Sequence, residues 1–206
     1  MARIAIARGS GPWLRKAGAV CFALVIAAAI SGAPPFVFVL GTAAMLSVFW
    51  FFRDPHRQIG QGWVAPADGR IIDAAELADG RTRLAIYLNI LNVHVVRSPV
   101  AGTVVSIEYR EGGRRLAFDK ESEHNERVIW RLGTGAGEVE VVQIAGAFVR
   151  RIVPYLQVGD AVARGGRMGL IRFGSRVDVY LPAGVPIAVS IGDRTRAGVT
   201  RLDGDG

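Results

Sequence analysis

Two long apolar runs dominate the first quarter of the chain. Residues 17–30 and 36–52 carry no charge and are joined by the hinge Ser-Gly-Ala-Pro-Pro. Neither run has a polar face, so a pair of helices in a soluble core is not expected. Each run is slightly shorter than the ~20 residues of a spanning helix, but the hinge and the preceding Trp13-Leu14 can lengthen it. The pattern predicts a membrane helical hairpin over residues 17–52, which either crosses the membrane or dips in and returns.

Basic residues flank this hairpin on both sides. Arg15 and Lys16 end a basic N-terminal segment, residues 1–16, and Arg53 follows the second run. Positively charged flanks stay in the cytoplasm, so both ends of the hairpin and all of residues 53–206 are expected there, at the inner cell membrane. A cleaved secretory signal is the alternative, because the chain starts with a basic segment, an apolar core and small residues. It does not explain the second apolar run.

From Val64 onward the pattern changes to short β-branched runs separated by glycine. This spacing predicts a mostly β domain. The stretches "APADGRIIDAAE" (65–76) and "SPVAGTVVSIEY" (98–109) both place a proline three residues before a glycine and then an alternating strand. With "VGDAVARGGRMGLI" (158–171) they resemble the barrel-sandwich-hybrid fold of biotinyl and lipoyl carriers. Such carriers attach their cofactor to a hairpin lysine, and the matching region has none, so a carrier function is not expected.

The overall charge narrows the choice of partners. The chain of 206 residues has a formal charge of +7, which suits an anionic membrane surface or a nucleic acid. The soluble part has no stripe of interleaved aromatic and basic residues, so nucleic acid is not an expected partner. The single cysteine, Cys21, lies in an apolar run and excludes a disulfide framework. Metal-ligand spacings are absent from the sequence as well, so no metal site is expected.

The pair Gly174-Ser175 interrupts an alternating stretch, "MGLIRFGSRVDVYLP" (168–182). One interpretation is a β-bulge or tight turn. A hydrolase nucleophile is not favoured, because the G-x-S-x-G pattern is absent. The third interpretation is self-cleavage, in which the Ser175 hydroxyl attacks the Gly174 carbonyl and moves the acyl group from nitrogen to oxygen. Elimination of that ester leaves dehydroalanine, and hydrolysis then gives a pyruvoyl group and ammonia.

Four motifs occur in order after the apolar N-terminus: "FFRDPHR" (51–57), "APADGRI" (65–71), "LNVHVVRSPVAG" (91–102) and "RFGSRVDVYLP" (172–182). Together they resemble the phosphatidylserine decarboxylase family, in the short form found in many bacteria and archaea, over nearly the whole chain. The resemblance implies a lyase of phospholipid biosynthesis that converts phosphatidylserine to phosphatidylethanolamine and CO2. It also implies an inactive proenzyme, a zymogen, that cuts itself at Gly174-Ser175 into residues 1–174 and 175–206.

The implied cofactor is a covalent pyruvoyl group derived from Ser175, which forms a Schiff base with the substrate. Decarboxylation of an α-amino acid needs an electron sink, which proteins commonly supply as pyridoxal phosphate on a lysine. After the hairpin the chain has one lysine, Lys120, in a polar run, so pyridoxal phosphate is not expected. The implied partners are phosphatidylserine, the membrane and the pairing of the two cleaved chains, with a higher homo-oligomer left open.

Asp68 and His94 match family positions thought to assist self-processing or decarboxylation. A histidine can take the Ser175 proton or return one to the substrate, and a carboxylate can orient the imidazole. A turn aspartate and a core histidine are the structural alternatives. Longer family members carry a second histidine three residues on, where this chain has Arg97. Arginine cannot act as a base at neutral pH, but it could bind the phosphate or carboxylate of the substrate.

Several features stay open at this stage. The rival function is a non-enzymatic, membrane-anchored barrel-sandwich adaptor, which would share the anchor and the glycine pattern but remain uncut. Arg53 and Arg57 are expected to hold the domain against anionic lipid. The polar stretch 111–127 is either a flap over the site or a solvated loop, and His56 and His124 are expected at the surface.

Overall fold

The computed structural model describes residues 4–112, 125–146, 152–172 and 175–204. The chain forms two compact units, Met1–His56 and Arg57–Gly206. Each unit has its own secondary structure. Residues 113–124 of the polar stretch 111–127, and Gly174, lie outside the described residues.

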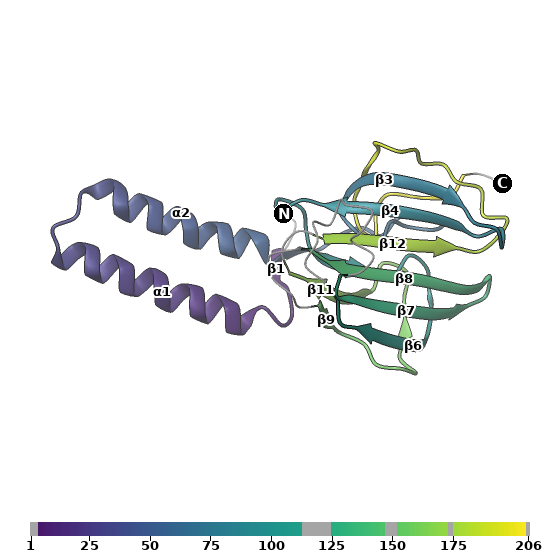
Figure 1. Ribbon diagram of the computed structural model, residues 1–206, viewed down its shortest axis with the longest axis horizontal. Helices are drawn as coiled ribbons and strands as arrows, with labels where there is room; N and C mark the ends of the chain where they lie inside the picture. Colours follow the sequence, from purple (N-terminus) through teal and green to yellow (C-terminus); the bar gives the residue numbers. More distant parts are fainter. Residues whose placement is uncertain (1–3, 113–124, 147–151, 173–174, 205–206) are drawn as a thin grey trace. The chain divides into compact units, whose positions relative to one another are not determined.

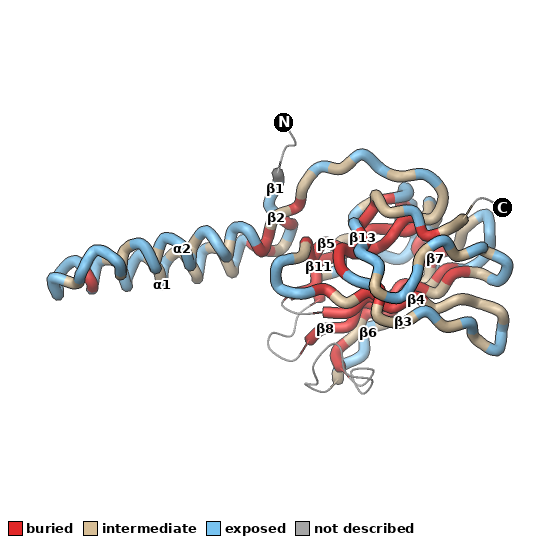
Figure 2. The backbone as a smooth tube through the Cα atoms, turned by 90° about the horizontal axis from the view of Figure 1, so that it is seen from above, coloured by how far each residue is buried: buried red, intermediate tan, exposed pale blue. Residues whose placement is uncertain are grey.

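The first unit is a helical hairpin closed by a short strand pair. Strand β1 (Ile4–Ile6) pairs antiparallel with β2 (Arg53–Pro55), and between them lie helices α1 (Gly11–Ile30) and α2 (Pro35–Phe51). The helices lie side by side, and most of their residues are exposed (Figures 1 and 2). By length and composition α1 is able to cross a membrane, while α2 is apolar but shorter. Exposed leucine, isoleucine and phenylalanine along both helices favour an apolar surrounding.

The second unit is built on an eight-stranded antiparallel sheet with the order β10-β6-β7-β8-β12-β4-β3-β13 (Figure 1). A three-stranded sheet has the order β5-β11-β9. The prediction of a mostly β domain preceded by apolar helices is confirmed. The strands are β3 (Gly69–Glu76), β4 (Thr82–Leu88), β5 (Val95–Arg97), β6 (Gly102–Arg110), β7 (Arg127–Thr134), β8 (Gly137–Ala145), β9 (Ile152–Pro154), β10 (Ala161–Val162), β11 (Arg167–Ile171), β12 (Ser175–Leu181) and β13 (Arg194–Thr195).

One face of the large sheet carries the main core. Side chains alternate between the two faces of a strand, so every second residue of β4, β7, β8 and β12 points to this core. The core includes Leu84, Ile86, Leu88, Trp130, Leu132, Val139, Val141, Val177, Val179 and Leu181, each at most 1% exposed. Burial of this many aliphatic and aromatic side chains is the main stabilising contribution to the second unit.

The described residues of the stretch 168–182 form two strands in different sheets, so they are not one strand with a bulge; the alternative of a tight turn falls on residues 173–174, outside the described residues. Its first half is β11, which pairs with β5 and β9 in the small sheet. Its second half is β12, which pairs with β4 and β8 in the large sheet. Ser175 therefore begins β12 in the large sheet, four residues after β11 ends in the small one.

Candidate active site

Ser175 is the first residue of β12, held in the middle of the large sheet. Its register partners are Leu88 on β4 and Ala145 on β8. The residue is fully buried, and its Oγ has no hydrogen-bond partner among the residues that the structure describes. A buried hydroxyl without a partner costs about 1–3 kcal/mol, so such a group requires a functional reason. Its place at the junction of two sheets gives a nucleophile on a rigid support.

His94 is tied to the segment that leads to Ser175. It lies just before β5, is fully buried, and its backbone oxygen accepts a hydrogen bond from Ile171 N at 3.1 Å. Ile171 ends β11, four residues before Ser175, and four residues span at most about 14 Å. The pairing of β5 with β11 therefore keeps His94 and Ser175 in one region.

The His94 ring has a defined tautomer when it is neutral. Its Nδ1 lies 2.9 Å from the carbonyl oxygen of Asn92. A carbonyl oxygen can only accept a hydrogen bond, so Nδ1 carries the proton and Nε2 carries the basic lone pair. The sequence suggested that a carboxylate orients this ring, whereas in the structure a backbone carbonyl two residues upstream does so.

Asp68 lies just before β3, and β4 alone separates β3 from β12. With neighbouring strands about 4.8 Å apart, this places Asp68 on the order of 10 Å from Ser175. Its two carboxylate oxygens accept hydrogen bonds from Arg57 Nη1 at 2.5 Å and Nη2 at 2.8 Å, and one also accepts from Ala197 N at 2.8 Å. Asp68 therefore anchors residues 57 and 197 beside the site.

Two arginines singled out in the sequence are enclosed. Arg57 has a side chain only 4% exposed and forms the bidentate pair with Asp68. It is therefore not available to hold a lipid surface, contrary to the expectation for it. Arg97 is 4% exposed, and its Nη1 donates to Gly165 O at 3.0 Å. That geometry favours positioning of the Gly165 turn over direct contact with a substrate.

Gln143 on β8 is a buried residue that was not predicted from the sequence as part of the site. Its register partner is Val177, two residues after Ser175 and on the same face of the sheet. Gln143 Oε1 accepts from Trp130 Nε1 at 2.8 Å, and Nε2 has no partner within the described part of the chain. A lone glutamine within the apolar run "VEVVQIAG" was the signal that could have identified it. It supplies an amide donor close to the serine.

A pocket of about 440 Å³ opens at the same end of the large sheet. It is lined by Gly69, Arg70, Tyr87, Asn89, Leu91, Asn92 and Arg194. Asn92 connects this pocket to the catalytic candidates, because its carbonyl oxygen holds the His94 ring. A ligand in the pocket would lie between two guanidinium groups. His56 is exposed, as expected, whereas Gly174, Lys120 and His124 lie outside the described residues.

The sequence of this chain is similar to those of known proteins. A sequence model described as phosphatidylserine decarboxylase matches residues 45–203, about three quarters of the chain, including Asp68, His94 and Ser175. The chain belongs to the phosphatidylserine decarboxylase family.

Individual members of this family are similar to the chain over nearly its whole length. A phosphatidylserine decarboxylase proenzyme from Streptomyces avermitilis is 52% identical over 204 residues, covering 98% of this chain and 95% of the relative. One from Thermobifida fusca is 52% identical over 201 residues, 97% of this chain and 93% of the relative. A Halobacterium salinarum protein, provisionally named archaetidylserine decarboxylase proenzyme, is 47% identical over 196 residues, 93% and 97% of the two chains. These similarities do not favour the adaptor alternative.

Proposed function

We propose that this protein decarboxylates phosphatidylserine to phosphatidylethanolamine and CO2, using a pyruvoyl group made from Ser175. The buried Ser175 hydroxyl at the junction of two sheets carries the proposal. The 52% identity to proteins named phosphatidylserine decarboxylase proenzyme supports both the reaction and a precursor that is processed. The residues present fit the cofactor, because it forms from a serine, and the buried Ser175 hydroxyl has no partner in the part of the chain that the structure describes.

Self-cleavage uses groups of this chain alone, apart from one water. Ser175 Oγ attacks the carbonyl carbon of Gly174, the Gly174–Ser175 C–N bond breaks, and the Ser175 nitrogen takes a proton. Loss of the Ser175 α-proton expels the Gly174 carboxylate and leaves dehydroalanine, which water converts to pyruvoyl with release of ammonia. His94 Nε2 is the base for the hydroxyl proton. Gln143 Nε2 is a donor for the charge that develops on the attacked oxygen.

The same residues serve turnover. The pyruvoyl carbonyl supplies the electron sink that decarboxylation requires. Once protonated, the His94 ring carries a second proton at Nε2 and can donate it to the substrate carbon after CO2 leaves. The Arg57–Asp68 pair positions the backbone around Ala197, and the Asn92 carbonyl keeps the imidazole in one orientation.

The proposed domain organisation follows from a lipid substrate. Residues 1–16 form a basic cytoplasmic segment, residues 17–52 anchor the protein in the inner cell membrane, and residues 53–206 are catalytic on the cytoplasmic side. A tether keeps the site near the headgroups while the acyl chains stay in the bilayer. The apolar α1 supports membrane association, and the basic flanks support this orientation.

The deciding experiment is the intact mass of the detergent-purified protein and of Ser175→Ala, with decarboxylation of phosphatidylserine measured on both. We expect two chains from the unmodified protein, the smaller beginning at position 175 and lighter by one ammonia than a chain with an N-terminal serine. We expect a single inactive chain from Ser175→Ala. An uncut, inactive unmodified protein would reject the proposal and return the adaptor function.

A further inference from the structure

A row of arginines crosses the outer face of the large sheet. It follows the direct register partners from strand to strand through β6, β7, β8, β12, β4, β3 and β13. Five of the seven positions are arginine and the other two are isoleucine and tyrosine. In spatial order the row is Arg110, Arg127, Ile144, Arg176, Tyr87, Arg70 and Arg194.

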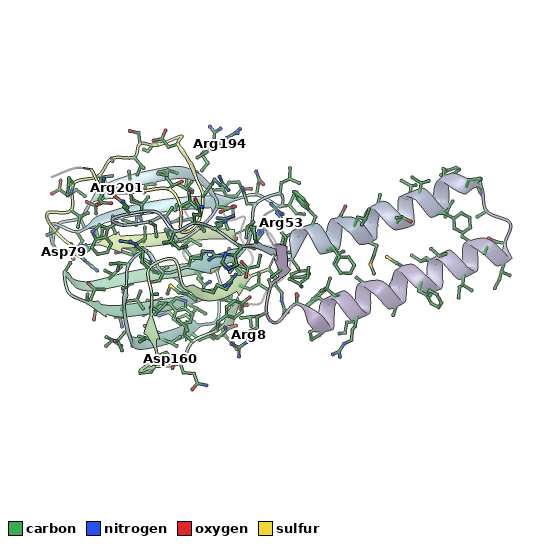
Figure 3. All side chains as sticks on the ribbon, turned by 180° about the vertical axis from the view of Figure 1, so that it is seen from behind. Arg8, Arg53, Asp79, Asp160, Arg194 and Arg201 are labelled. Atoms are coloured by element: carbon green, nitrogen blue, oxygen red, sulfur yellow. The ribbon has the colours of Figure 1, made fainter. Side chains whose placement is uncertain are left out.

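The members of the row differ in how they are paired. Arg176 is buried and forms an ion pair with Asp178, and Arg110 is paired with Glu108. Arg70, Arg127 and Arg194 have no acidic partner among the residues that the structure describes. Arg70 and Arg194 are both exposed, are cross-strand neighbours and line the 440 Å³ pocket (Figure 3 labels Arg194). Adjacent like charges destabilise a sheet unless an anion joins them.

The row lies at the active-site end of the sheet. Arg176 follows Ser175 directly, and Tyr87 precedes Leu88, the register partner of Ser175. Successive residues of a strand point to opposite faces, so the row lies on the face of the sheet opposite to Ser175. Ile144 and Arg176 in the middle of the row are buried, and its exposed arginines lie at the two ends: Arg110 at one, Arg70 and Arg194 at the other. A ligand bound along the row would therefore lie on the other face of the sheet, next to the strand end that carries Ser175.

An exposed apolar loop lies beside the row. Ile90 and Leu91 are 61% and 67% exposed. Their loop is fixed by two side-chain hydrogen bonds, from Leu91 N to Asn89 Oδ1 at 2.9 Å and from Asn89 N to Asn92 Oδ1 at 2.9 Å. Two large aliphatic side chains on a braced loop next to cationic groups suit a membrane interface, where apolar tips enter the headgroup region and arginines meet phosphates.

We propose that this arginine row and the Ile90-Leu91 tip form the surface by which the catalytic unit docks on an anionic phospholipid bilayer. The Arg70–Arg194 pocket takes a lipid phosphate, and the loop enters the interface beside it. Charge complementarity selects the partner, because the row is cationic and the substrate of the proposed function is an anionic lipid. The inference rests on that function and replaces Arg57, which is enclosed by Asp68, as the lipid contact.

The test uses full-length, self-cleaved protein and vesicles of phosphatidylcholine with a fixed, small fraction of phosphatidylserine. Phosphatidylglycerol is raised from none to about 40% to change surface charge without changing substrate. We expect the decarboxylation rate of the unmodified protein to rise with phosphatidylglycerol and to fall with salt. The variant Arg70→Gln/Arg127→Gln/Arg194→Gln should lose the response, with a rate on anionic vesicles lower by at least about tenfold, since each arginine at such a surface contributes roughly fivefold.

A matched variant separates the row from overall charge. Arg81→Gln/Arg164→Gln/Arg201→Gln removes the same three charges from exposed positions elsewhere, and Arg201 lies well away from Arg194 in Figure 3. It should keep the phosphatidylglycerol response. An equal loss in both triple variants would overturn the proposal.

A soluble substrate separates docking from catalysis. On dihexanoylphosphatidylserine below its micelle concentration, Arg127→Gln, a change in the row outside the Arg70–Arg194 pocket, should retain kcat within about twofold, and intact mass should show normal cleavage. A tenfold loss of kcat there would reject docking in favour of a role in the chemistry. An unmodified protein inactive on both substrates would instead reject the proposed function. If the triple variant remains uncut, Arg194→Gln alone and the salt dependence of the unmodified protein decide the question.

The loop is tested in the same way. Ile90→Ser/Leu91→Ser should lower the rate on vesicles by about tenfold relative to the soluble lipid. Val158→Ser, at another exposed apolar position, is the control and should not change that ratio. An unchanged ratio for the loop variant would exclude the tip from the docking surface.

Discussion

The imidazole of His94 is held by a backbone group, so its role depends on the ring itself. The Asn92 carbonyl fixes the tautomer, and Nε2 is the basic nitrogen. Glutamine fills a similar volume and offers hydrogen bonds, but it cannot accept and return a proton at neutral pH. We expect His94→Gln to fold and to cleave itself more slowly by about 10²–10⁴-fold, measured as the time course of intact mass.

His56→Gln is the matched control for this experiment. His56 is exposed and belongs to the first unit, so its replacement should leave the cleavage rate unchanged. Cleavage of His94→Gln at the rate of the unmodified protein would show that another group takes the proton.

The Arg57–Asp68 pair is a buried ion pair in which both carboxylate oxygens are engaged. Removal of one partner leaves an uncompensated buried charge, so Arg57→Leu and Asp68→Leu should each lower the free energy of unfolding by about 3 kcal/mol. The double variant Arg57→Leu/Asp68→Leu should recover much of that loss. Urea unfolding of the four proteins gives the coupling energy, and strictly additive losses would contradict the pair.

At the scale of elements, β3 approaches β4 closely at Gly69. A Cβ at this position would lie 2.9 Å from Ile86 Cγ2 and closer still to the backbone oxygen of Tyr87. Backbone atoms cannot move without separating the strands, and Asp68 directly precedes this contact. We expect Gly69→Ala to destabilise the protein by about 3 kcal/mol and to slow self-cleavage, measured by urea unfolding and intact mass.

Gly135→Ala provides the comparison for that variant. Gly135 lies in the turn between β7 and β8, and an added Cβ would meet nothing within 4 Å. Its unfolding free energy should change by less than about 0.5 kcal/mol. Similar losses at both glycines would mean that backbone flexibility, and not close approach, explains Gly69.

The same elements show what the sequence could and could not predict. Alternation and glycine spacing predicted a mostly β unit, and the two apolar runs predicted the helices, because these signals are local. The change of sheet between β11 and β12 was not predicted, since strand partners are chosen over long separations. His94 could be identified by its motif, but the carbonyl that orients it carries no side-chain signal.

Contacts between residues far apart in the sequence also explain why the roles of Arg57 and of the arginine row were not predicted. Arg57 was expected to face lipid because it follows the membrane exit, whereas its partner Asp68 encloses it. The arginine row could not be recognised as a row, because its seven members come from seven strands spread along the chain. Register, which depends on the packed sheet, brings them into line.

For the molecule as a whole, the proposed cut falls next to a central strand. Strand β12 lies between β4 and β8, and residues 185–204 pack beside β3 and Trp63. The small chain would therefore remain embedded in the large one after cleavage, held by two ladders of backbone hydrogen bonds. Near the C-terminus of the small chain, Asp203 forms a contact with the large chain. Its Oδ1 accepts a hydrogen bond from Trp63 N at 2.7 Å and another from Arg201 Nε at 3.2 Å.

The contribution of Asp203 to the free energy of unfolding should depend on pH. Burial alone would raise the pKa of the Asp203 carboxyl, but the hydrogen bonds from Arg201 and Trp63 outweigh burial and hold its pKa below the ordinary value. We expect Asp203→Asn to lower the free energy of unfolding by about 1–2 kcal/mol at pH 7. Because the folded pKa is the lower one, the unfolded state binds more protons in acid. The difference between the two proteins should be complete above pH ~4 and should shrink as pH falls further.

Urea unfolding of the cleaved protein from pH 7 to pH 3 measures this difference, with Asp160→Asn as the control. Asp160 accepts from Gln157 N within an exposed turn of the large chain, so its replacement does not touch the contact between chains. It should cost less than about 0.5 kcal/mol at pH 7. A difference for Asp203→Asn that persists undiminished at pH 3 would mean that the side chain acts through packing, because a protonated carboxyl and an amide can both accept the one hydrogen bond, from Trp63 N, that joins the chains.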